Sequence, residues 1–111
     1  MSFSPSEILL VPVIFTDGSG RKQRPVIVLF SSADADLVVA PLTSESPRTP
    51  RDLEVIDWRS SGLPLPSTVR LDKPITIAKS TVIKRMGKLT PADWDRVKSV
   101  LRQLFAEILS H

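Results

Sequence analysis

The stretch RKQRPVIVLF, residues 21–30, decides how the rest of the chain can fold. Three cations stand among its first four residues, and an unbroken apolar run follows Pro25. Successive residues of a strand point to opposite faces, so this run predicts a strand over 24–31 that is buried on both sides. A residue before proline is held in extended geometry. We therefore expect Arg24 to project from a rigid strand.

Other apolar, β-branched segments lie before and after this strand, separated by turn-forming residues. They predict strands at 7–15, 37–43, 53–56 and 67–72, and one or two strands over 75–86 that end at Gly87. Pro12 is expected to limit the pairing of the first strand or to mark a bulge. The segments rich in turn formers predict loops or irregular structure at 16–23, 32–36, 44–52 and 57–66.

The segment TPADWDRVKSVLRQLFAEIL, residues 90–109, predicts one amphipathic helix. Thr90 is expected as the N-cap, with Pro91 at the first helical position and Asp93 at the third, in a variant of the capping box. Apolar residues recur at helical spacing at Trp94, Val97, Leu101, Leu104 or Phe105, and Ile108. We expect this stripe to pack on the sheet as part of the core.

Several short strands followed by one helix predict a mainly β fold: a small β-barrel or a strongly coiled sheet capped by the helix. The strands do not alternate with helices, which argues against a doubly wound fold. A chain of 111 residues is long enough for one hydrophobic core, so we expect a single domain over 1–111.

Composition excludes several kinds of chemistry. The chain has no cysteine, and its one histidine is the last residue, His111, which argues against a zinc site and against a Ser-His-Asp triad. The net charge of +3 permits a polyanionic partner without requiring one. The longest apolar run, residues 8–15, is too short to span a bilayer. We expect a cytoplasmic protein with no membrane association.

Three polar clusters stand beside the predicted strands. Arg24 is a flanking cation that keeps a strand edge soluble, or a ligand for an anion. Thr43 and Ser44 end the third strand, where hydroxyls cap a turn or donate to a phosphate oxygen. Arg70 and Asp72 fall on one face of a strand, as a surface ion pair or as a pair for acid–base work on a phosphodiester.

Four segments in order cover almost the whole chain: ILLVPVIFTDGSGRKQRPVIVL, VVAPLTSES, GLPLPSTVRLDKPITI and VIKRMGKLTPADWDRVKSVL. In these segments the chain resembles the MazF/PemK-type toxins of bacterial toxin–antitoxin systems. The resemblance implies an SH3-like small β-barrel with a C-terminal helix, and a homodimer. It also implies a ribosome-independent endoribonuclease that a cognate antitoxin protein neutralises.

The resemblance also assigns site residues. Arg24 matches the arginine of the family's Arg-Pro motif, Thr43 and Ser44 match its Thr-Ser, and Arg70 and Asp72 match the Arg-x-Asp pair used in catalysis by the PemK branch. The chain departs from the family in two places: Ser6-Glu7 replaces a frequent Gly-Asp, and the first loop lacks the histidine of the PemK branch.

The implied mechanism uses no metal, cofactor or histidine. The 2′-hydroxyl of RNA is the nucleophile, Asp72 is the expected base, and Thr43 adds a neutral donor. Arg24 and Arg70 are expected to stabilise the charge on the phosphorane. A guanidinium with a pKa above about 12 gives up its proton reluctantly, which favours this role over that of a general acid.

Further residues are expected to bind single-stranded RNA along two flanking loops: Arg21, Lys22, Ser44, Arg48, Arg51 and Thr68. Phe15 and Trp58 either stack on bases or are buried. Two alternatives stay open at this point. One is a non-catalytic inhibitor like the CcdB-type toxins, which bind DNA gyrase through the end of the C-terminal helix. The other is a barrel that only binds nucleic acid or its antitoxin.

Overall fold

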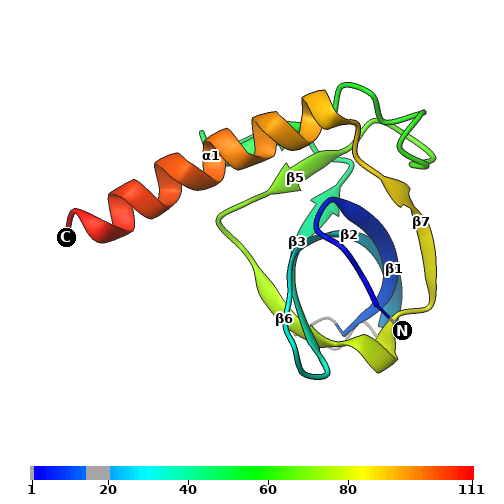
Figure 1. Cartoon of the computed structure of the whole chain (residues 1–111). Helices are drawn as coiled ribbons and strands as arrows, with labels where there is room; N and C mark the ends of the chain where they lie inside the picture. The colour runs from blue at the N-terminus through cyan, green and yellow to red at the C-terminus, as the bar shows by residue number, and fades with distance from the viewer. Residues whose placement is uncertain (1, 15–20) are drawn as a thin grey trace.

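The computed structural model describes residues 2–14 and 21–111, in a mainly β fold with one C-terminal helix (Figure 1). The strands are β1 (Glu7–Ile14), β2 (Arg21–Ser31), β3 (Asp36–Thr43), β4 (Asp52–Glu54), β5 (Thr68–Arg70), β6 (Ile75–Ala78) and β7 (Lys84–Lys88). A short 3-10 helix, η1 (Lys79–Thr81), separates β6 from β7, and the chain ends in α1 (Pro91–Leu109).

The strands form one antiparallel sheet with the order β4-β5-β3-β2-β1-β7. β3 lies at its centre: one edge pairs with β2, and the other pairs with β5 near Thr43 and with β6 near Asp36. The strands curl strongly (Figure 1). Within residues 2–14 and 21–111, however, no ladder joins β7 to β4 or to β6. The structure therefore shows a strongly coiled sheet, one of the two expected forms, and in this part of the chain its ladders do not close it into a barrel.

Residues 26–28 of β2 are buried on both faces, as predicted from the apolar run, whereas Leu29 is half-buried and Phe30 is 58% exposed. Val26 and Val28 belong to a cluster inside the curl of the sheet, whereas Ile27 between them belongs to a second cluster that includes Val97 of α1. The strand begins at Arg21 and not at residue 24, because residues 21–23 continue the ladder with β1. The basic segment is thus part of the strand, and the expected loop 16–23 is wrong for its last three residues.

Pro12 limits the pairing of β1, as expected. The ladder with β7 ends at Leu10, while the ladder with β2 continues through Pro12 to Ile14. Proline lacks the N–H that a second ladder needs, so it is tolerated where the strand is an edge. The register of the β1–β7 ladder shifts between Ile8 and Leu9, where Met86 of β7 is the extra residue, so the irregularity lies away from the proline.

Other predicted boundaries differ. β4 ends at Glu54 and not at residue 56: the Val55 backbone N–H still donates to the Ser67 carbonyl at 2.9 Å, and the chain turns from Ile56 onward. β5 covers only 68–70 of the predicted 67–72. Gly87 lies inside β7 and does not end it. A Cβ at Gly87 would overlap the backbone carbonyl of Ser61, so glycine is required by a close crossing of two backbones.

The helix begins as predicted. The Thr90 hydroxyl accepts a hydrogen bond from the Asp93 backbone N–H at 3.3 Å, with Pro91 in the first turn. The Asp93 carboxylate does not complete a capping box: it is buried and accepts hydrogen bonds from the backbone N–H groups of Ile56 (3.2 Å) and Asp57 (2.9 Å). The start of α1 is therefore tied to the turn that follows β4.

The apolar stripe of α1 packs on the sheet over only part of its length. Trp94, Val97 and Leu101 join the core, whereas Phe105 and Ile108 are exposed. The C-terminal half of the helix projects beyond the sheet (Figure 1). The expectation that the whole stripe is core is wrong for its last turns. No helix in the described part of the chain is long and apolar enough to cross a membrane.

Candidate active site

Arg24 and the hydroxyls at the end of β3 meet in one pocket, here called the Arg24 pocket. Arg24 is exposed and pairs with Val11 of β1, next to the buried Val26. The pocket has a volume of about 160 Å³ and is lined by Arg24, Pro25, Leu42, Thr43, Ser44, Pro64, Leu65 and Ser67. Two of the three predicted clusters are thus brought together by the pairing of β2 with β3.

The third cluster lines a second pocket, here called the Arg70 pocket. This pocket has a volume of about 220 Å³ and is lined by Arg48, Thr49, Asp52, Arg70, Asp72 and Lys73. Asp72 lies in the turn after β5 and not on the strand, because β5 ends at Arg70. The predicted shared strand face is therefore wrong for Asp72, but Arg70 and Asp72 line the same pocket.

Glu45 connects the two pockets. Its backbone N–H donates to the Thr43 hydroxyl at 3.2 Å, in the Arg24 pocket. Its carboxylate accepts from Arg70 Nη2 at 2.7 Å and also forms an ion pair with Arg48, both in the Arg70 pocket. β3 and β5 bring the two pockets close, since Thr43 pairs with Thr68 two residues before Arg70.

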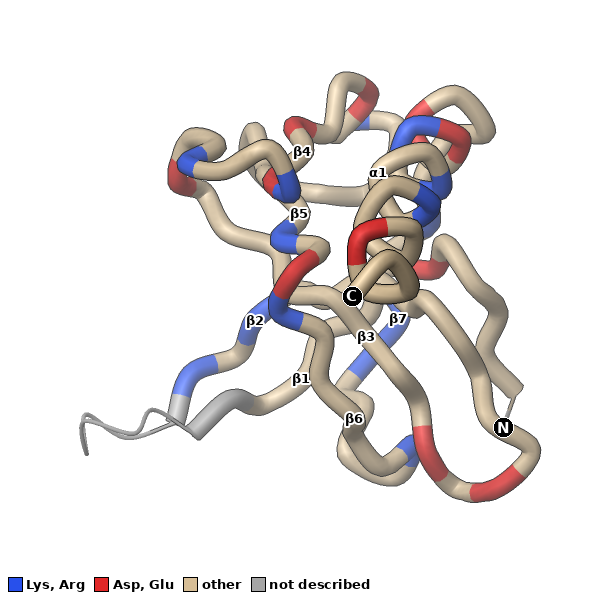
Figure 2. The backbone as a smooth tube through the Cα atoms, turned by 90° about the vertical axis from the view of Figure 1, so that its left-hand side faces the viewer, with Lys and Arg blue, Asp and Glu red and all other residues tan. Residues whose placement is uncertain are grey.

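The predicted RNA-binding cations lie in different surroundings. Lys22 is exposed on β2; the side chain of Arg21 lies outside the described residues. Arg48 is exposed in the loop after β3, whereas the Arg51 side chain is only 14% exposed and pairs with Glu107 of α1. Figure 2 shows basic positions along β2 and at β5 on the same side of the molecule. Among the predicted cations whose side chains are described, Arg51 is the one that pairs with the helix.

The predicted polar and aromatic contacts also differ. Ser44 lines the Arg24 pocket, but Thr68 is buried. Thr68, Ser44, Ser67 and half-buried Trp58 line a third pocket, of about 340 Å³, beside the Arg24 pocket. Trp58 packs against the core, and the Arg59 guanidinium lies 4.9 Å from its ring centroid. The expectation for Phe15 lies outside the described residues.

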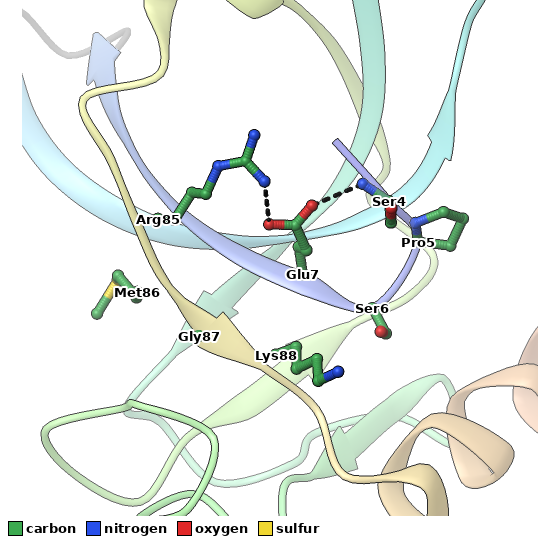
Figure 3. Close-up of a pocket in the computed structure, with 8 residues that line it drawn as sticks. All are labelled: Ser4, Pro5, Ser6, Glu7, Arg85, Met86, Gly87 and Lys88. Carbon is green, nitrogen blue, oxygen red and sulfur yellow. Dashed lines mark hydrogen bonds and ion pairs between the residues drawn. The ribbon is translucent and has the colours of Figure 1, made fainter. Parts of the chain in front are cut away.

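A larger pocket, of about 590 Å³, lies away from these residues, between the start of β1 and β7 (Figure 3). Glu7 is one of the residues that line this pocket. Its carboxylate accepts hydrogen bonds from the Ser4 backbone N–H at 2.7 Å and from Arg85 Nη1 at 2.8 Å. Arg85 also stacks on Phe3, 4.4 Å from the ring centroid. These contacts hold the N-terminal segment against the sheet.

The described residues contain no group of three or more His, Cys, Asp or Glu side chains arranged to hold a metal ion. Metal independence itself stays a prediction. Sequence reasoning did not single out Glu45, Asp52 or Lys73. Glu45 stands in the quoted motif LTSES, but no local pattern indicates that its carboxylate reaches Arg70, which is 25 positions away.

Comparison with known protein families decides the identity of this fold. The sequence model of one family, described as "PemK-like, MazF-like toxin of type II toxin-antitoxin system", matches residues 4–105. The chain belongs to this family. The resemblance predicted from the four motifs is thereby confirmed, and the pockets described above belong to a PemK-like, MazF-like toxin.

Solved structures share the fold of this PemK-like chain. One is an "Endoribonuclease in complex with its cognate antitoxin from Mycobacterial species", with 19% identity over 95% of this chain and 96% of that chain and a TM-score of 0.76. "Mycobacterium tuberculosis toxin MazF-mt6" has 22% identity over 93% and 97% of the two chains and a TM-score of 0.73. A MazE-MazF structure from Deinococcus radiodurans has 19% identity over 94% and 97%, with a TM-score of 0.65. A search of curated proteins found no significant match.

Proposed function

We propose that this chain is an endoribonuclease that cleaves single-stranded RNA as the toxin of a toxin–antitoxin pair. The observation that carries the proposal is the juxtaposition of the Arg24 and Arg70 pockets, which share Glu45 as their link. Two arginines, a hydroxyl and a carboxylate there suit a phosphodiester. The solved relative described as an endoribonuclease, which has the same fold, supports this reading.

The proposed reaction is an internal transfer. The ribose 2′-oxygen attacks phosphorus while Asp72 accepts its proton, and the bond to the 5′-oxygen of the next nucleotide breaks. The products are a 2′,3′-cyclic phosphate and, once the leaving oxygen gains a proton, a 5′-hydroxyl. Arg24 and Arg70 stabilise the negative charge that accumulates on the non-bridging oxygens, and the Thr43 hydroxyl adds a neutral donor.

Cleavage without a metal is the test of this function. Purified protein is incubated with single-stranded RNA in EDTA, and the product ends are identified. We expect cleavage to persist and to leave cyclic-phosphate ends, because the arginines supply the positive charge that a metal would supply. Asp72→Asn should lose activity, whereas the matched control Asp95→Asn, on the exposed face of α1, should keep it.

Intact RNA with wild-type protein, or abolition of cleavage by EDTA, would remove the proposed reaction. Intact RNA would instead favour a non-catalytic inhibitor of the CcdB type. Products with a 3′-hydroxyl would indicate attack by water and not by the 2′-hydroxyl.

We infer that the cognate antitoxin is an acidic, partly disordered peptide that covers these pockets and folds as it binds. The complex with a cognate antitoxin described for one relative supports this inference. The peptide should compete with RNA, and its affinity should fall as salt concentration rises. The check is a competition assay; a co-encoded partner that binds without blocking cleavage would contradict it.

The same proposal includes an SH3-like small barrel, a homodimer and action in the cytoplasm, where messenger RNA is translated. The coiled sheet capped by α1 supports the barrel description, although its ladders stop short of closure in the described residues. The exposed apolar end of α1 supports the dimer.

A further inference from the structure

Glu45 occupies an unusual position between the two pockets. One carboxylate oxygen, Oε2, interacts with two guanidinium groups: it accepts a hydrogen bond from Arg70 Nη2 at 2.7 Å and forms an ion pair with Arg48. The side chains of Glu45 and Arg48 are 57% and 63% exposed, whereas that of Arg70 is only 19% exposed. Arg70 is therefore the most buried of the three residues, whereas Glu45 and Arg48 belong to the exposed loop after β3.

A carboxylate oxygen and a phosphate oxygen are equivalent partners for a guanidinium. Arg70 also carries one donor that Glu45 does not use: its Nε is buried and has no hydrogen-bond partner in the part of the chain that the structure describes. Because that nitrogen is buried, an incoming ligand meets the outer nitrogens of the guanidinium. A phosphodiester offers two non-bridging oxygens, one for each of the two guanidinium groups that now share Glu45 Oε2. The two guanidinium groups therefore suit a phosphate better than the single carboxylate oxygen they share.

We propose that Glu45 is a resident anion that occupies a backbone-phosphate subsite on Arg70 and Arg48 and is displaced when RNA binds. This inference rests on the proposed function. Exposed ion pairs are weak, so an RNA phosphate can replace the carboxylate at small cost. The Glu45 backbone bond to Thr43 does not involve the carboxylate, so the side chain can leave while the loop keeps its anchor in the Arg24 pocket.

The test measures binding separately from cleavage. The probe is a fully 2′-O-methylated RNA oligonucleotide, which keeps the phosphates and lacks the attacking hydroxyl. Glu45→Gln should lower the dissociation constant about two- to fivefold, the range expected when a weak exposed ion pair no longer competes. Asp95→Asn changes the net charge equally, breaks only a pair with Lys98 on α1, and should leave the affinity unchanged.

A mutant cycle separates competition from general electrostatics. In a background that lacks both guanidinium groups, Arg48→Ala with Arg70→Ala, the gain from Glu45→Gln should disappear, because the groups for which carboxylate and phosphate compete are gone. With unmodified RNA, Glu45→Gln should lower KM and leave kcat unchanged. A gain that persists without both arginines would show a diffuse charge effect and overturn the proposal. Unchanged or weaker binding by Glu45→Gln would overturn it too, because Glu45 would then only brace the loop.

The outcomes also distinguish this inference from the proposed function. If wild-type protein binds the methylated RNA but does not cleave the unmodified RNA, the nuclease proposal fails and the binding series still decides the role of Glu45. If it cleaves and the Glu45 variant shows no gain, only the inference about Glu45 fails. Absence of RNA binding by the wild type would overturn both.

Discussion

Arg24 illustrates how a single residue is positioned for chemistry. Its side chain is exposed, yet its backbone is paired with Val11 in the ladder of β1 and β2. Pro25 sets the extended backbone, and the buried residues from Val26 onward anchor the strand in the core. The guanidinium therefore starts from a rigid base beside Thr43, which is the arrangement that electrostatic stabilisation of a phosphorane needs.

Replacement of Arg24 should affect activity and not stability. Arg24→Ala is expected to slow RNA cleavage by roughly 10²- to 10³-fold, the scale for loss of one preorganised charge stabiliser. The free energy of unfolding should change by less than about 0.5 kcal/mol, because the side chain is exposed. Arg24→Lys should restore only part of the rate, since an ammonium lacks the planar fork. Cleavage assays and thermal unfolding measure the two effects.

Arg59→Ala is the matched control for Arg24, because Arg59 is exposed, lies over Trp58 and lines neither pocket. It should cleave RNA at nearly the wild-type rate. A folded Arg24→Ala protein with wild-type activity would reduce Arg24 to a cation that keeps the strand edge soluble.

At the scale of elements, α1 is held to the sheet by a buried carboxylate. Asp93 is 1% exposed and accepts from two backbone N–H groups in the turn after β4. It also accepts from Arg96 Nη1 at 2.9 Å, and the same nitrogen donates to the carbonyl of Glu54. The third residue of the helix thereby fixes the turn that carries Trp58 and one wall of the pocket beside the Arg24 pocket.

Asp93→Ala should therefore destabilise the protein strongly. It leaves the backbone N–H groups of Ile56 and Asp57 without their acceptor and removes the ion pair with Arg96, which keeps only the Glu54 carbonyl, and this should cost about 3 kcal/mol. Thr90→Ala removes the helix cap and one exposed hydrogen bond to the Asp57 carboxylate, and should cost about 1 kcal/mol. Urea unfolding curves give both values.

The control for Asp93 is Asp95→Asn, on the exposed face of the same helical turn, which should change stability by less than about 0.5 kcal/mol. A cost below about 1 kcal/mol for Asp93→Ala would mean that water replaces the carboxylate and that packing alone holds the helix.

At the scale of the whole molecule, the C-terminal end of α1 presents large apolar side chains to solvent, and no described part of the same chain covers them. Phe105, Ile108 and Leu109 are 57%, 56% and 82% exposed on the part of the helix that projects from the sheet (Figure 1). Phe105 and Leu109 line a shallow groove of about 510 Å³ with Leu101. An apolar surface of this kind is typical of an interface between subunits.

We expect a homodimer in solution. Light scattering at micromolar concentration should give twice the mass of 12.3 kDa, because a second copy can cover the apolar helix end. Phe105→Ser should shift the mass toward that of one chain, whereas Arg59→Ala, which leaves this surface intact, should not. A monomeric wild-type protein would contradict the dimer and any groove shared between two copies.

Local patterns in the sequence determined several parts of this protein. The apolar run after Pro25 predicted a strand buried on both faces, and Thr90 with Pro91 predicted the start of α1. Burial on both faces and helix capping depend on neighbouring residues, so a linear sequence reveals them. The motifs around Arg24, Thr43 and Arg70 also indicated the protein family, and the match of the family model to residues 4–105 confirmed it.

Only the tertiary structure decided the contacts between distant residues. The carboxylate of Glu45 reaches Arg70 across 25 positions, and Asp93 reaches Ile56 across 37. Arg51 turns to Glu107, and Gly87 passes against Ser61. Such contacts depend on how β3 pairs with β5 and how α1 crosses the sheet. Composition and periodicity describe which face of an element is apolar, but not which residue of another element lies opposite it.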